Sequence, residues 1–387
     1  MKIAIIGHKR IPSNEGGIEK GVEQHAWRMV ERGHSVTVYN RGGHNIYGKE
    51  YDKEKRKWYK GIRIVTVPTP RGAAEVPVYS LLATLHCIFV SRPDVISFRA
   101  SGPCFMIPLA RLFGIRVVAS LHGIDSLRDK WGKFASWYLR KGEHAAAKSA
   151  NVCLVLSRNM KEYIDNKYGI NSVLFANGVD APEKCAPQII KEKWGIEKDG
   201  YILSLGRIVP EKGLHYLIPA FKKCKTNKKL VIAGGSNSNK DYYESLLEMA
   251  KDDDRIVFTG FVTGQTVTEL YSNAYIFAIP SNLEGMANAL LEAMSYGNCC
   301  LVSDIPENTE VVNDKAVWHR KSSEQDIYDK LQMLLDSPEE VARYKKEAAP
   351  YILKKYSWDR VVDQMLEIYS GNIVEYADVL KRHYQSQ

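Results

Sequence analysis

The chain has 387 residues, 45% of them apolar, and its 54 Lys and Arg against 45 Asp and Glu give a formal net charge of +9. This length and composition predict two globular domains with full cores. The lack of any uncharged apolar run of about 18 residues argues against a membrane-spanning helix. The start has no signal-peptide pattern, and seven scattered cysteines without a Cys-x-x-Cys pair argue against a disulfide framework or a zinc site. We therefore expect a cytoplasmic protein.

Short apolar runs alternate with helical patterns through the first half of the chain. Strands are predicted at residues 2–6, 36–39, 62–67, 95–97, 116–121, 152–155 and 173–175. Helices are predicted between most of them, at residues 22–32, 78–90, 104–113 and 157–168. This alternation is typical of a parallel sheet whose two faces are covered by helices.

The alternation stops at residues 177–200, a polar segment with Pro182 and Pro187 that we interpret as an interdomain connection with one short helix. It resumes with strands at residues 201–205, 230–233, 256–259, 276–279 and 299–302, and helices at 214–223, 242–250, 267–273 and 287–296. After Ser323 the pattern is helical. The sequence thus predicts two open α/β sheets, whose ligand crevices lie outside the carboxyl ends of the strands. If the two crevices face each other, the loops after the strands form one cleft.

The loop after the first strand, residues 8–17, ends in Gly16 and Gly17 before a helix. Paired glycines at a helix start let backbone N–H groups approach a phosphate. The pattern is not the spaced Gly-x-Gly-x-x-Gly of a nicotinamide-binding fold, and by itself it also fits a plain turn.

Residues 204–213 follow the first strand of the second domain and carry two cations, Arg207 and Lys212. Two cations beside a helix N-terminus suit a diphosphate, because Arg offers a planar fork and Lys a compact charge. The alternative is surface charge on a loop without a site.

Residues 280–297 contain Glu284 and Glu292, which are eight residues apart. This spacing is about two helical turns, so the carboxylates share a side if the helix begins early. Glu292 lies in an apolar run, where an isolated Glu is rare without a partner. The backbone amides of the intervening loop can bind sugar hydroxyls and phosphate; these residues are Gly285, Met286, Ala287, Asn288 and Ala289.

Together, Glu284-x7-Glu292, Gly206-Arg207 with Lys212-Gly213, and Gly16-Gly17-Ile18-Glu19 resemble the retaining glycosyltransferases of family 4, which have the GT-B fold. Smaller matches are residues 32–39, 177–180, 258–262 and 357–358. A narrower match, to a bacterial subgroup containing rhamnosyltransferases of polysaccharide assembly, rests on residues 10–12, 16–19, 80–86, 130–134 and 303–308.

The resemblance implies an α/β fold of two facing Rossmann-like domains, residues 1–178 on the acceptor side and 179–356 binding the nucleotide sugar. A terminal helix in residues 357–387 would cross back onto the first domain. No metal or other cofactor is expected, and the donor is a nucleotide-diphosphate sugar, with rhamnose as the candidate sugar. The acceptor is expected to be a glycan or lipid-linked oligosaccharide at the inner face of the membrane.

The resemblance also assigns roles. Glu284 would approach the donor sugar, Glu292 would hold the ribose, and Arg207 and Lys212 would neutralise the departing diphosphate. Gly17 would contact that diphosphate from the first domain, and His122 would lie near the reacting sugar. The nucleotide base is assigned to Phe261 and Val262. Where the family often has Phe-Gly-Leu-Pro after the first Glu, this chain has residues 286–289 as MANA.

Several alternatives remain at this point. An epimerase of the same fold would form product without an acceptor, and a nucleotide-sugar sensor or nucleic-acid binder would use the basic charge without turnover; no interleaved aromatic and basic motif supports a nucleic-acid domain. Segments 49–63 and 130–148 are both locally basic, and the second could lie on an anionic bilayer or could be a helix with its apolar side in the core. The acidic run 252–254 resembles a metal motif but precedes a strand, so we interpret it as a solvated turn.

Overall fold

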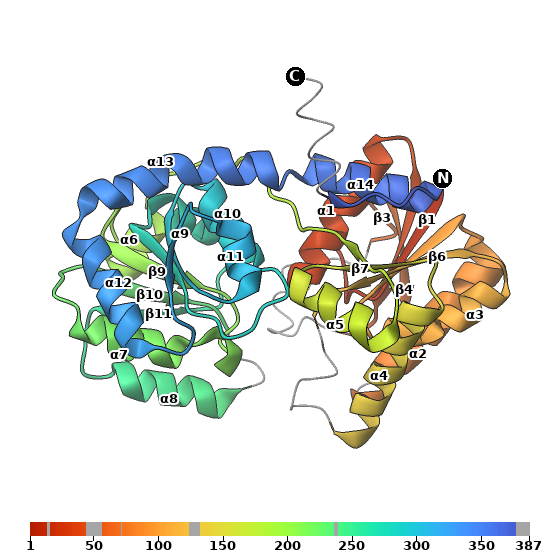
Figure 1. The fold of residues 1–387 in the computed structure, drawn as a ribbon, viewed down its shortest axis with the longest axis horizontal. Coiled ribbons are helices and arrows are strands. Elements are labelled where there is room, and N and C mark those ends of the chain that lie inside the picture. The colour runs from red at the N-terminus through yellow and green to blue at the C-terminus, as the bar shows by residue number, and fades with distance from the viewer. Residues whose placement is uncertain (14–15, 44–55, 71, 124–131, 236–238, 377–387) are drawn as a thin grey trace. The chain divides into compact units, whose positions relative to one another are not determined.

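The computed structural model describes the chain except residues 14–15, 44–55, 71, 124–131, 236–238 and 377–387. The chain forms two compact units. The first unit contains Met1–Gly178 and Trp358–Gln387, and the second contains Val179–Ser357 (Figure 1). The predicted segments 49–63 and 130–148 lie in part outside the described residues.

The first unit is built on an eight-stranded sheet with the order β3-β4-β2-β1-β5-β6-β7-β8. β3 pairs with β4 in antiparallel fashion, and the pairs from β4 to β8 are parallel. The strands are β1 (Lys2–Ile6), β2 (Ser35–Arg41), β3 (Trp58–Tyr59), β4 (Ile62–Val67), β5 (Val95–Arg99), β6 (Arg116–Leu121), β7 (Val152–Val155) and β8 (Val173–Leu174). β1, β5 and β7 are buried along almost their whole length, as expected of strands covered on both faces.

Helices cover both faces of this sheet (Figure 1). They are α1 (Gly17–Glu31), α2 (Glu75–His86), α3 (Ile107–Leu112), α4 (Lys133–Lys148), α5 (Arg158–Tyr168) and α14 (Trp358–Ser370), with the short helices η2 (Gly72–Ala74), η3 (Cys87–Ser91) and η4 (Pro103–Met106). α5 shows how local sequence sets the bounds. The Ser157 hydroxyl accepts a hydrogen bond from the Met160 N–H at its start, and Gly169 ends it at φ 60°.

The last described helix, α14, belongs to the first unit although the second unit precedes it in the chain. Its Asp359 and Asp363 carboxylates pair with the guanidinium of Arg32, the residue after α1, at 2.9 and 3.1 Å. The Trp358 ring meets the His25 ring edge-on, with centroids 5.2 Å apart. Trp358 is buried, so these contacts fix α14 on the first unit.

The second unit has a six-stranded parallel sheet with the order β11-β10-β9-β12-β13-β14. The strands are β9 (Tyr201–Leu205), β10 (Lys229–Ala233), β11 (Ile256–Gly260), β12 (Ile276–Ile279), β13 (Cys299–Ser303) and β14 (Val317–His319). The helices are α6 (Ile189–Trp194), η6 (Pro210–Lys212), α7 (Leu214–Lys223), α8 (Lys240–Ala250), α9 (Gln265–Asn273), α10 (Asn288–Ser295), α11 (Pro306–Val312), α12 (Glu324–Asp336) and α13 (Pro338–Lys355).

The predicted α/β class with two parallel sheets is confirmed. β3, β14 and α11 were not predicted, because each is too short to show a period. In β14 the central Trp318 is 43% exposed, so the strand carries no continuous apolar run. The first helix begins at Gly17 rather than near Val22, so the glycine pair forms its start.

One helical stretch of the first unit was also not expected. Gly72–Ser91 is long and apolar enough to cross a membrane by length and composition alone, and it is only partly buried. The polar Glu75, Ser80 and Thr84 interrupt the apolar run in the sequence, which concealed it. Tyr79 and Ala83 lie in the core of the unit, so one side of the stretch packs on the domain.

Candidate functional site

The strand order places the candidate residues at the reversal point of each sheet. In the second unit, β9 leads to β10 and β11 on one side, while β12 leads to β13 and β14 on the other. The chain therefore leaves β9 and β12, which are neighbours, in opposite directions. Such a switch point opens a crevice at the carboxyl ends of the strands. Arg207 and Lys212 follow β9 and Glu284 follows β12.

The loop after β9 is fixed by backbone contacts with the neighbouring strand ends. The Gly206 N–H donates to the Ala233 carbonyl at 2.9 Å, and the Ile208 N–H donates to the Gly235 carbonyl at 3.1 Å. Gly213 has φ +68°, and a Cβ there would lie 2.1 Å from the Pro280 carbonyl oxygen. Glycine is thus required where the two loops meet, because a side chain would push them apart.

Lys212 and Glu284 form an ion pair across these loops. The Lys212 Nζ lies 2.5 Å from Glu284 Oε1, and the side chains are 22% and 9% exposed. The Ser281 hydroxyl donates to the same carboxylate oxygen at 2.6 Å. Two donors on one oxygen fix the carboxylate beside the crevice before any ligand is bound.

A pocket opens between the two loops. Its lining residues are Ser204, Leu205, Gly206, Arg207, Ile208, Lys212, Leu214, Ile232, Ala233, Ile279, Pro280 and Ser281. Arg207 and Lys212 are therefore brought to one pocket, as a diphosphate site requires. Arg207 is exposed, so its guanidinium is available to solvent and solutes.

Serine and asparagine residues beneath this pocket were missed at the sequence level. The Ser303 hydroxyl donates to the Ser281 carbonyl at 2.5 Å, and the Asn308 amide donates to the Ser303 hydroxyl at 3.0 Å. All three side chains are buried. They tie the start of the Glu284 loop to β13 and α11. The signal available was the position of Ser303 directly after the predicted strand 299–302; Asn308 lies in α11.

α10 begins at Asn288, so Glu284 lies outside the helix and the condition for two carboxylates on one helical side is not met. Glu292 lies in the helix and is half-buried. It accepts a hydrogen bond from Tyr271, and burial together with the Glu292 charge raises the pKa of Tyr271 well above its usual value. The buried partner expected for Glu292 is therefore the Tyr271 hydroxyl.

The other predicted residues of the second unit lie near these strand ends. Gly285, Met286 and Ala287 form the turn into α10, and Asn288 and Ala289 form its first turn, where backbone N–H groups lack helical acceptors. Phe261 and Val262 follow β11, the edge strand, and are half-buried. The Gly234 N–H after β10 donates to the Gly260 carbonyl at 3.0 Å, which joins the β10 and β11 ends.

In the first unit, the switch point lies between β1 and β5. Gly16 caps α1, and Gly17 is its first residue. The Glu19 carboxylate turns back and accepts the Lys9 N–H at 2.9 Å, which closes the loop onto the start of the helix. A Cβ on Gly16 would lie 2.8 Å from the Glu19 carboxylate, so this closure favours glycine.

His122 follows β6 and lies beside Arg99, the last residue of β5. Burial and the Arg99 charge lower the pKa of His122 to about 3. Its ring meets Phe175 edge-on at 5.6 Å. Arg99 is fully buried and donates to His25 Nδ1 at 3.3 Å and to the Tyr369 hydroxyl of α14 at 3.4 Å. His122 is therefore a neutral imidazole near neutral pH. It can donate or accept hydrogen bonds, but it does not supply a positive charge.

Among the described residues, no group of three or more His, Cys, Asp or Glu side chains is placed to hold a metal ion. The acidic run before β11 is engaged with cations. Asp252 pairs with Lys222 at 2.5 Å and Asp253 pairs with Arg255 at 2.7 Å. The Arg255 hydrogen bond lowers the pKa of Asp253. These carboxylates lie at the amino end of the strand, away from the crevice.

Comparison with known families gives two matches that together span most of the chain. Residues 15–182 match the model described as Glycosyltransferase Family 4. Residues 187–350 match the model described as Glycosyl transferases group 1.

Individual relatives agree with these matches. An uncharacterized glycosyltransferase of Methanocaldococcus jannaschii is 32% identical over 95% of this chain and 98% of its own length. A GDP-mannose-dependent alpha-(1-6)-phosphatidylinositol monomannoside mannosyltransferase of Mycolicibacterium smegmatis is 28% identical over 74% of this chain and 76% of its length. Among solved structures, Anabaena HepE in complex with UDP and glucose has a TM-score of 0.78 at 17% identity and covers 96% of this chain and 99% of its own.

Proposed function

The chain belongs to the glycosyltransferases of group 1 and family 4, and we propose that it transfers a hexose from a nucleotide diphosphate to a lipid-linked glycan with retention at the anomeric carbon. One observation carries the proposal. Arg207, Lys212 and Glu284 meet at the switch point of the second sheet, with Lys212 2.5 Å from Glu284.

The proposed reaction breaks the bond between the anomeric carbon and the diphosphate oxygen, and the bonding electrons leave with the diphosphate. The acceptor hydroxyl attacks from the side on which the diphosphate departs, and its proton passes to the departing oxygen. Negative charge therefore develops on the diphosphate, where Arg207, Lys212 and the first amides of α10 would stabilise it.

The remaining roles follow from this placement. The Glu284 carboxylate, already oriented by Ser281 and Lys212, would accept hydrogen bonds from donor-sugar hydroxyls. Glu292 would exchange Tyr271 for the ribose diol. Phe261 and Val262 would contact the base. Similarly, a neutral His122 would hydrogen-bond a sugar hydroxyl, and the N-terminal amides at Gly16 and Gly17 would meet phosphate.

Three donor sugars are candidates, in a definite order. Mannose is the first donor to test, because the relative from Mycolicibacterium smegmatis is named as GDP-mannose-dependent. Rhamnose, expected from the narrower sequence match, has no support among these relatives and becomes the second donor. Glucose is a third, since the HepE complex contains UDP and glucose.

A lipid-linked acceptor in bacterial surface polysaccharide assembly is the proposed substrate, with the protein bound to the cytoplasmic face of the membrane. Two observations support it. The same relative is named for a phosphatidylinositol monomannoside acceptor, and the chain carries a net charge of +9, which favours an anionic surface.

The test measures nucleotide release and sugar transfer with GDP-mannose, dTDP-rhamnose and UDP-glucose, with and without a lipid-linked acceptor. We expect one donor to give an acceptor-dependent product, and Arg207→Gln to slow it by about 100-fold. Conversion of a donor without any acceptor would support an epimerase instead. Full turnover by Arg207→Gln would refute the assignment of the site.

A further inference from the structure

The first unit exposes apolar side chains along one helical stretch. On α2 and η3, Leu81 and Phe89 are 40% and 57% exposed and lie eight residues apart, on one helical side. Leu82 and Val90, the next residues in the sequence, are 39% and 61% exposed and have the same spacing. These side chains belong to Gly72–Ser91, the stretch with the length and composition of a membrane span.

The end of α3 extends this surface. The Phe113 ring packs edge-on against the Phe89 ring, with centroids 5.5 Å apart. Leu112 beside it is 80% exposed. We call the combined surface the α2–α3 patch; its residues are Leu81, Leu82, Phe89, Val90, Leu112 and Phe113.

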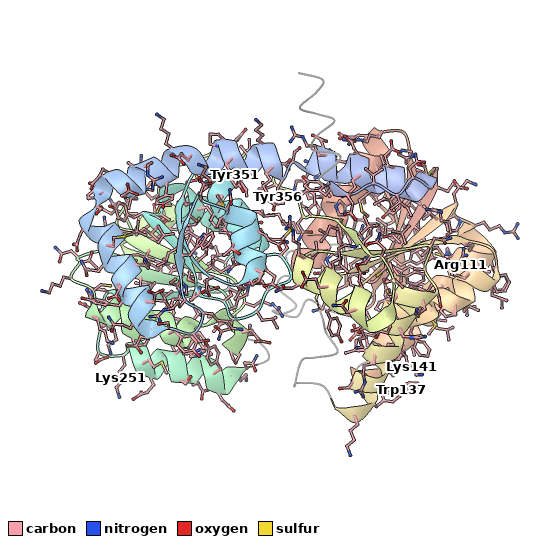
Figure 2. The ribbon with its side chains drawn as sticks, viewed as in Figure 1. Arg111, Trp137, Lys141, Lys251, Tyr351 and Tyr356 are labelled. Atoms are coloured by element: carbon pink, nitrogen blue, oxygen red, sulfur yellow. The ribbon has the colours of Figure 1, made fainter. Side chains whose placement is uncertain are left out.

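Two exposed arginines border the patch. Arg92 directly follows η3 and Arg111 directly precedes Leu112, and both are exposed. Figure 2 shows Arg111 at the outer surface of α3. The sequence between residues 76 and 123 has four arginines, of which Arg99 is fully buried, and a single acid, the exposed Asp94, which accepts the Lys2 N–H at 2.7 Å. An apolar patch bordered by arginines matches the interface of an anionic bilayer, where hydrocarbon and phosphate lie adjacent.

The helix α4 also exposes large apolar side chains beside a cation. On α4, Phe134 and Trp137 are 60% and 46% exposed and stack at 5.9 Å. Trp137 and Lys141, one turn apart, both lie at the surface in Figure 2. The Glu143 carboxylate on this helix is buried and pairs with Lys167 at 2.8 Å, so it adds little negative charge outside.

We propose that the α2–α3 patch binds the protein to a bilayer of anionic phospholipid, with Leu112, Phe113, Phe89 and Val90 entering the acyl boundary and Arg92 and Arg111 contacting headgroup phosphates. This deepens the proposed membrane-side function by naming the surface. Its test needs no sugar donor, so a failure here is distinguishable from a failure of the transferase assignment.

The experiment measures co-sedimentation of the full chain with phosphatidylcholine vesicles that contain or lack phosphatidylglycerol. We expect binding to the anionic vesicles, weakened by salt. Val90→Ser with Leu112→Ser should weaken it by about tenfold or more, because two apolar side chains no longer leave water. Arg92→Gln with Arg111→Gln should weaken it by about 25-fold, since each cation near the surface contributes about fivefold.

Leu247→Ser with Met249→Ser on α8 is the matched control. These residues are 39% and 41% exposed in the second unit, and we expect their substitution to leave vesicle binding unchanged. All variants should keep the wild-type thermal transition. Equal binding by the patch variants and the wild type would overturn the proposal. So would a wild-type dimer in sedimentation velocity that the patch variants dissociate, because the patch would then be an interface between copies.

Discussion

The Lys212–Glu284 pair gives the sharpest prediction. In Lys212→Met the ammonium is lost while the Glu284 carboxylate stays 9% exposed, with Ser281 as a remaining donor. A largely buried charge that loses its partner destabilises the fold, here by about 2 kcal/mol, less than a fully buried pair because Lys212 is itself 22% exposed. Urea unfolding of the isolated variant measures this loss.

The double variant Lys212→Met with Glu284→Gln separates stability from chemistry. It leaves no unpaired charge, so we expect it to recover about half or more of the lost stability. Turnover should not recover, since the cation that faces the diphosphate is still missing, and we expect it to stay about 100-fold or more below the wild type. Denaturant titration and initial rates on the same preparations give both values.

Lys222→Met is the control, because Lys222 also lies 2.5 Å from a carboxylate, that of Asp252. That carboxylate is 66% exposed, so water replaces the lost partner and we expect no measurable change in stability or turnover. If Lys212→Met lost no more stability than Lys222→Met, burial of Glu284 would have no energetic consequence and the reasoning would be refuted.

Three further predictions follow. Arg207→Gln should change the free energy of unfolding by less than about 0.5 kcal/mol while slowing turnover, as expected of an exposed side chain that acts on the substrate. Gly213→Ala should cost about 2 kcal/mol or more, from its positive φ and the clash with Pro280, whereas Gly206→Ala, with nothing within 4 Å of its Cβ, should cost less than half as much in the same urea titration. The free energy of unfolding should fall as the pH drops from 6.5 towards about 3, and His122 should contribute about 1.4 kcal/mol per pH unit to this fall. In that range the His122 imidazole is protonated in the unfolded chain and neutral in the folded chain. Unfolding at several pH values should show a smaller slope in His122→Asn; an unchanged slope would contradict the lowered pKa.

The sequence predicted what depends on short-range patterns. β1, β6, β7, β9 and β12 begin and end where their apolar runs do. Residues that follow strands could be assigned to one edge because parallel strands share their direction. Arg207 and Lys212 accordingly line one pocket, with Glu284 paired to Lys212.

What could not be predicted depends on contacts through space. Nothing in the local sequence joins Ser303 to Ser281, or Tyr271 to Glu292. Arg99 ends a strand like a site residue, yet it is fully buried because α14, about 270 residues later, covers it with Tyr369. Such pairings form only after the whole unit has assembled.

The place of α14 has a consequence for synthesis on the ribosome. The first unit is closed by Trp358 and Tyr369, which are buried in it, so it cannot complete its core until the last helix has emerged. The second unit is one uninterrupted segment, Val179–Ser357, whose ends are already joined by the Val179 N–H donating to the Tyr356 carbonyl at 2.7 Å. Domains usually fold in the order in which they leave the ribosome. In this chain we therefore expect the second unit to fold first, although it is synthesised later. The core of the first unit stays incomplete until α14 packs on it, so we expect chaperones to act on the first unit during synthesis.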